Sequence, residues 1–128
     1  MSRFATLVVL AFLIVSCGQA TASTSPASPS TSSTPAVEVR VADFKITPAE
    51  VRVGAGVVTL AVANDGPTPH NLTIRDAAGA LVMATPEIRP GASETLSGAI
   101  AGGTNVLFCS LPGHESLGMR AMLVIGGG

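Results

Sequence analysis

The sequence is short of the residues on which several classes of protein depend. Its 128 residues include no Trp or Tyr, two Cys and two His, and only 12% are charged. Two cysteines do not build the disulfide framework of a small secreted scaffold, and two histidines do not supply a three-histidine catalytic zinc site. Seven basic and eight acidic residues give a formal net charge of −1, so we expect no nucleic-acid partner.

Apolar residues, in contrast, make up 47% of the chain, and many of them lie at the N-terminus. Arg3 precedes an apolar run at residues 5–15. This run is shorter than the roughly 20 residues that a bilayer-spanning helix needs. It fits the hydrophobic region of a secretory signal peptide, which we place at residues 1–16.

The end of this run, residues 14–17 (Ile-Val-Ser-Cys), resembles a bacterial lipobox with Ile in place of the usual first Leu. A lipobox is cleaved before its cysteine, and the thiol of that cysteine is acylated. The resemblance implies that Cys17 is a lipid anchor, which holds a protein firmly when more than one acyl chain is attached. The alternative is an ordinary signal peptide followed by an incidental cysteine.

Residues 19–36 are mostly Ser, Thr, Pro and Ala and carry no charge. Such a segment lacks the large apolar side chains that offset the entropy of ordering. We therefore expect residues 17–36 to form a flexible tether that begins at the lipidated cysteine. The remaining residues, 37–128, suffice for one small folded domain.

The hydrophobic pattern of this domain predicts strands. Val37, Val39 and Val41 alternate with charged or small residues, which is the period-2 pattern of a half-buried strand. Further strand-like runs lie at residues 57–64, 71–76, 81–84, 93–100, 105–109 and 119–125. Turn-forming residues separate these runs, and no 3.6-residue stripe indicates a helix. We predict an all-β domain, an antiparallel sandwich of about seven to eight strands.

One group of residues near the C-terminus suggests metal chemistry. Cys109, His114 and Met119 are each separated by four residues, and His70 stands upstream at the start of a predicted strand. A thiolate, two imidazoles and a thioether form a soft donor set that suits copper, whereas a thioether is a poor zinc ligand. Taken singly, each has a plainer role, such as a buried cysteine or a core methionine. Alternation places Met122 on the opposite face from Met119, so we expect Met119 to be the axial ligand and Met122 to pack in the core.

With this ligand loop, the domain resembles a cupredoxin of the plastocyanin/azurin type. The C-x4-H-x4-M spacing is most similar to that of rusticyanin and sulfocyanin. The resemblance covers residues 37–128 and includes segments 43–50, 53–56, 64–66, 70–71, 90–91, 103–104 and 108–119. It implies a Greek-key sandwich that holds one type 1 copper ion through His70, Cys109, His114 and Met119.

The resemblance also assigns roles to two neighbours of these ligands. It implies that the backbone N–H of Asn71 faces the cysteine sulfur and that the Asn71 side chain bonds to Ser110. The alternative is that Asn71 is a turn residue and Ser110 merely fills the loop.

From this resemblance we expect a monomeric electron carrier, not an enzyme, because a copper enzyme would need additional His-rich centres. The electron would pass through the edge of His114. The apolar rim expected around that edge consists of Leu111, Pro112, Gly113, Leu117 and Gly118. Its partners would be redox proteins such as a cytochrome complex or a terminal oxidase, in the cell envelope outside the cytoplasm. The alternative function is copper binding and trafficking in the envelope with the same ligands.

Overall fold

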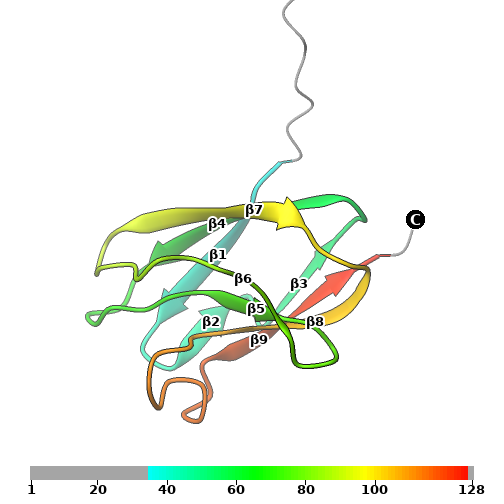
Figure 1. Cartoon of the computed structure of the whole chain (residues 1–128). Coiled ribbons are helices and arrows are strands. Elements are labelled where there is room, and N and C mark those ends of the chain that lie inside the picture. Colours follow the sequence, from blue (N-terminus) through cyan, green and yellow to red (C-terminus); the bar gives the residue numbers. More distant parts are fainter. Residues whose placement is uncertain (1–34, 127–128) are drawn as a thin grey trace, which may run out of the picture. The chain divides into compact units, whose positions relative to one another are not determined.

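The computed structural model describes residues 35–126, which form two layers of β-strands (Figure 1). The strands are β1 Val37–Ala42, β2 Lys45–Thr47, β3 Glu50–Val53, β4 Val57–Asn64, β5 Thr73–Arg75, β6 Leu81–Ala84, β7 Ser93–Ala99, β8 Gly103–Phe108 and β9 Arg120–Ile125. The expected signal peptide, Cys17 and nearly all of the expected tether lie outside the described residues. Within residues 35–126 there is no helix long and apolar enough to span a membrane.

The all-β sandwich is confirmed, with two differences in detail. One sheet has the order β2-β1-β4-β7 and the other has the order β3-β9-β8-β5-β6. The described domain has nine strands rather than seven to eight, because β2 and β3, of three and four residues, are too short to show a clear alternation. The sheets are mixed rather than purely antiparallel, because β1 pairs with β4 and β3 pairs with β9 in parallel.

The parallel pairing of β1 with β4 follows from the path of the chain between the layers. After β1 the chain turns back as β2, enters the other sheet as β3, and returns as β4 beside β1. A return by way of the opposite sheet leaves β4 pointing in the same direction as β1. Alternation in a sequence reports which face of a strand is buried, and it carries no information about the direction of the neighbouring strand.

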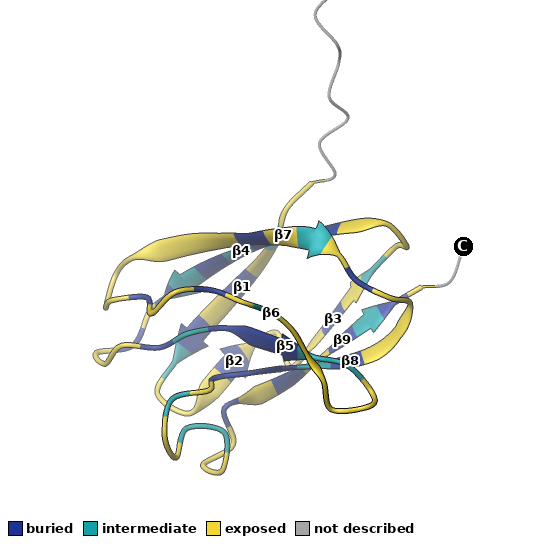
Figure 2. Cartoon of the chain, in the orientation of Figure 1, coloured by how far each residue is buried: buried dark blue, intermediate teal, exposed yellow. Residues whose placement is uncertain are grey.

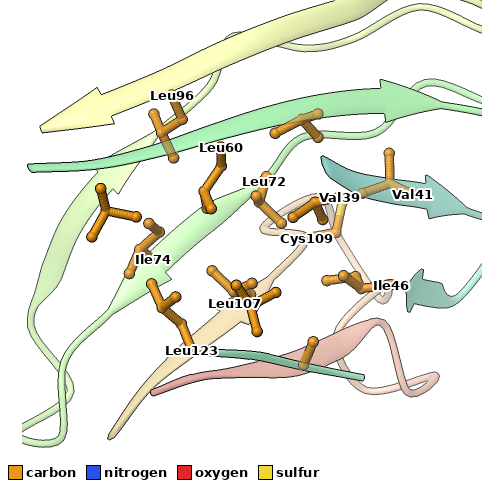
Figure 3. Packing of buried hydrophobic residues seen from close by; sticks show 14 of the residues in the cluster. Val39, Val41, Ile46, Leu60, Leu72, Ile74, Leu96, Leu107, Cys109 and Leu123 are labelled. Atoms are coloured by element: carbon orange, nitrogen blue, oxygen red, sulfur yellow. The ribbon is translucent and has the colours of Figure 1, made fainter. Parts of the chain in front are cut away.

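The core lies between the two layers and is almost entirely aliphatic (Figures 2 and 3). β4 alternates strictly, so that Val58, Leu60 and Val62 are buried and belong to the same cluster as Leu107 and Leu123 of the other sheet. Fully burying each such side chain contributes about 1.5–3 kcal/mol. Packing of these branched side chains therefore holds the sandwich together without large aromatic rings.

The strand register brings distant parts of the sequence to one end of the sandwich. Phe108, the last residue of β8, is paired with Thr73 of β5 on one side and with Arg120 of β9 on the other. The residues just after β8, just before β5 and just before β9 therefore gather at the same end. The loop between β8 and β9, orange in Figure 1, lies at that end.

Candidate metal centre

The four predicted ligands lie at this end of the sandwich. His70 precedes β5 and is fixed by a short bridge to Ile88, with backbone hydrogen bonds of 3.1 and 2.6 Å. Cys109 follows β8 and Met119 precedes β9, and the Cys109 N–H donates to the Met119 carbonyl at 3.2 Å. His114 stands midway between them, and its carbonyl accepts a hydrogen bond from the Met119 N–H at 3.1 Å.

Three donor atoms converge to within 4.8 Å of one another: one nitrogen each from His70 and His114, and the Cys109 sulfur. The two Nδ1 atoms are 3.1 Å apart, and the Cys109 Sγ lies 3.5 Å from Nδ1 of His114. His70, Cys109 and Met119 have no exposed surface, whereas His114 is half-buried. Cys109 is in the same buried cluster as Val39, Val41 and Leu72 (Figure 3).

The two methionines differ in their surroundings. Met119 belongs to the buried cluster and is the methionine whose thioether would bind copper, while Met122 is 44% exposed. The prediction that Met122 packs in the core is wrong, because β9 turns that side chain outward, next to β3, which pairs it with Glu50.

A carboxylate outside the predicted set touches one of the histidines. Asp43, in the turn between β1 and β2, places Oδ1 3.0 Å from Nε2 of His70. The Thr68 hydroxyl donates to the same Oδ1 at 2.6 Å. This hydrogen bond, and then the one from His70, lowers the pKa of the Asp43 carboxyl. Nothing in the spacing of the sequence marked Asp43, since it lies 27 residues from His70.

An ion pair ties the ligand loop to β5. Arg75 makes two hydrogen bonds to the Glu115 carboxylate, one of them at 3.1 Å, and its guanidinium lies 4.5 Å above the ring centre of Phe108. The hydrogen bonds from Arg75 lower the pKa of Glu115. Because Glu115 follows His114 directly, this pair limits the movement of the loop that carries the histidine. We call it the Arg75–Glu115 pair below.

Comparison with known proteins assigns the family. A family model described as a cupredoxin-like domain matches residues 5–125. The chain belongs to the cupredoxin family. No curated protein matches it in sequence.

Solved cupredoxin structures share the fold at low sequence identity. Auracyanin from Roseiflexus castenholzii is 22% identical, with 72% of this chain and 97% of that chain covered and a TM-score of 0.64. An azurin from Methylomonas sp. strain J is 18% identical, with 71% and 97% covered and a TM-score of 0.63. A purple cupredoxin from Nitrosopumilus maritimus is 15% identical, with 70% and 99% covered and a TM-score of 0.54.

The donor set of this cupredoxin fits the copper ion that the family binds. A cysteine thiol, two imidazole nitrogens and a thioether are the donors of blue-copper sites. Here they come from Cys109, His70, His114 and Met119, which together form a candidate ligand site. The convergent sulfur and nitrogen atoms suit a soft ion, and the carboxylate of Asp43 contacts His70 at Nε2 rather than at the Nδ1 that faces His114.

Asn71 and Ser110 join the two segments that bear ligands. The Asn71 side chain donates from Nδ2 to Oγ of Ser110 at 2.8 Å and accepts the Ser110 N–H at 2.8 Å. These paired bonds link the residue after His70 to the residue after Cys109, which restrains both ligands. The contact of the Asn71 backbone N–H with the cysteine sulfur stays a prediction.

The residues expected to form the rim line the loop around His114. Pro112, Gly113, Leu117 and Gly118 are exposed, and Leu111 is half-buried against the core. Phe44, which the sequence analysis left out of the rim, is 43% exposed and lies edge-on to the His114 ring, with the ring centres 5.6 Å apart. It adds an aromatic side chain to the surface around His114.

Proposed function

We propose that this cupredoxin carries single electrons between redox proteins of the cell envelope, through one copper ion held by His70, Cys109, His114 and Met119. When bound, copper supplies one-electron chemistry between Cu(I) and Cu(II). The observation that carries the proposal is the convergence of sulfur and nitrogen donors within 4.8 Å at one end of the sandwich.

The surroundings of the ligands support a site that changes little between oxidation states. Cys109 and Met119 are joined by a backbone hydrogen bond, and the Arg75–Glu115 pair and the Asn71–Ser110 bonds restrain the loop between them. A preorganised ligand set has little to rearrange when an electron arrives or leaves.

The half-buried His114 provides the route for the electron. Its ring is the ligand nearest to solvent. The rim residues Pro112, Gly113, Leu117 and Gly118 are exposed and uncharged, and the nearby charge of Glu115 is paired with Arg75. Small apolar surfaces suit the weak, transient contacts of electron-transfer partners. A cytochrome complex or a terminal oxidase would fit this role.

Voltammetry and chelator competition test the proposal together. An electron carrier should show a reversible one-electron wave and keep its Cu(I) when a moderate Cu(I) chelator is added. A copper-trafficking protein with the same ligands should give up Cu(I) readily. Rapid loss of Cu(I) with no reversible wave would contradict electron transfer and favour trafficking.

We also propose that Cys17 anchors the protein to the outer face of the cytoplasmic membrane or to a periplasmic membrane surface. The lipobox-like residues 14–17 and the apolar run before them support this. Mass spectrometry of the mature N-terminus should find an acylated Cys17 as the first residue. Cleavage at another bond, with an unmodified thiol at Cys17, would contradict the anchor.

A further inference from the structure

The β1–β2 turn contacts both histidines of the site. Asp43 reaches the Nε2 atom of His70, on the side of the ring opposite the Nδ1 that faces His114. The next residue, Phe44, packs its ring against His114. Phe44 has a φ of 58°, a left-handed conformation that is unusual for an aromatic residue. Such backbone outliers are concentrated at functional sites.

The contact of Asp43 determines which nitrogen of His70 carries a proton. A neutral imidazole has one N–H and one lone pair, and an ionised carboxylate only accepts hydrogen bonds. Nε2 must therefore carry the hydrogen that Oδ1 of Asp43 accepts at 3.0 Å. The lone pair is then on Nδ1, the atom directed at His114 and Cys109.

The carboxylate itself is held in place. The Thr68 hydroxyl donates to Oδ1 of Asp43, and the loop that carries Thr68 is fixed by buried Asn64, which donates to the Thr68 carbonyl at 2.8 Å. Gly66 lets this loop pack closely, because a Cβ there would lie 3.1 Å from Nε2 of His70 and 3.2 Å from the Asp43 nitrogen. The arrangement of Asp43 and His70 is thus held both by the hydrogen bonds of Thr68 and Asn64 and by the close packing at Gly66.

We propose that Asp43 is a positioning residue that holds His70 as the Nε2–H tautomer, with Nδ1 free to bind copper, and that its negative charge favours the oxidised ion. The proposal rests on His70 being a copper ligand. A carboxylate bonded to a ligating histidine makes that ligand more basic, and loss of such a partner typically costs 10–100-fold in metal affinity. The more highly charged Cu(II) loses more of this stabilisation than Cu(I).

The experiment compares full-length wild type with Asp43→Asn, Asp43→Ala and the matched control Asp76→Asn. Asp76 follows β5, whereas His70 precedes it, so the control lies at the other end of that strand. An Asn side chain at position 76 can still accept the hydrogen bonds that the Ala78 and Ala80 N–H groups donate to Asp76. All three variants lose one negative charge. The first readout uses copper-free protein at mildly alkaline pH, with imidazole ¹H–¹⁵N NMR correlations. The second is the reduction potential of the copper-loaded protein.

Wild type should show the Nε2–H tautomer at His70, and Asp43→Ala should lose this preference. Asp43→Asn should lower the ratio of Cu(II) to Cu(I) affinity about tenfold, which raises the reduction potential by about 59 mV. Asp76→Asn should leave both readouts unchanged. An Nδ1–H tautomer in wild type, or equal potentials for Asp43→Asn and Asp76→Asn, would overturn the role of Asp43. A wild type without a thiolate-to-copper band would instead refute the copper site itself.

Discussion

Replacing Gly66 with alanine tests how tightly the His70 loop packs on the β1–β2 turn. Gly66 is buried, and the added Cβ would lie 3.1 Å from Cα of Ala42, 3.1 Å from Nε2 of His70 and 3.2 Å from the Asp43 nitrogen. Two of these atoms belong to the backbone, and the third belongs to a fully buried ring. None of the three can swing away as the tip of a flexible side chain would.

The size of the effect follows from overpacking alone. Gly66 does not have a positive φ, so alanine there brings no backbone penalty. Forcing a methyl group into a closely packed site typically costs about 1–3 kcal/mol. For a domain of this size, that lowers Tm by about 5–15 °C. Because the new methyl presses on His70, the affinity for copper should fall as well.

The assay is thermal and urea unfolding of copper-free protein, since bound metal would add stability by mass action. Gly54→Ala is the matched control, because a Cβ at Gly54 meets nothing within 4 Å and its φ is not positive. Gly54→Ala should leave the free energy of unfolding unchanged or raise it by up to about 1 kcal/mol, because alanine lowers the conformational entropy of the unfolded chain. If Gly66→Ala unfolds at the same midpoint as Gly54→Ala, the close packing of this loop is refuted.

Two further substitutions test the loop and the core. Glu115→Gln removes the negative charge that pairs with Arg75. Because both side chains are partly exposed, the free energy of unfolding should fall by less than about 1 kcal/mol. Copper loss to a chelator should nevertheless be faster, and an unchanged rate would show that the pair does not restrain the loop. Leu60→Ala opens a cavity in the core and should cost about 2–5 kcal/mol in urea unfolding, where a loss below about 1 kcal/mol would contradict its full burial.

The sequence predicted the sandwich and pointed to the four candidate ligands because both leave local signals. The alternating valines of β1 and β4 report a buried face directly. The ligands stood out because Cys, His and Met are rare in this chain and chemically distinct. Direction of pairing left no such signal, so the parallel pair of β1 and β4 was missed.

The contacts around the ligands were harder to predict because they join residues distant in the sequence. Asp43 and His70 are 27 residues apart, and Arg75 and Glu115 are 40 residues apart. From the sequence alone, such charged residues cannot be distinguished from ordinary surface residues, because only the strand register shows which of them are neighbours. Asn71 and Ser110 are also distant in the sequence, 39 residues apart, and their contact was predicted only because the family resemblance implies it. Met122 was misplaced because alternation predicts opposite faces for two residues and does not tell which face is covered.

The visible absorption spectrum of the protein during titration with Cu(II) tests the central claim most directly. We predict an intense thiolate-to-copper band that saturates at one equivalent. The band should be lost in Cys109→Ser and kept in the matched variant Cys17→Ser. A colourless protein, or a band that survives in Cys109→Ser, would contradict a copper site built on Cys109.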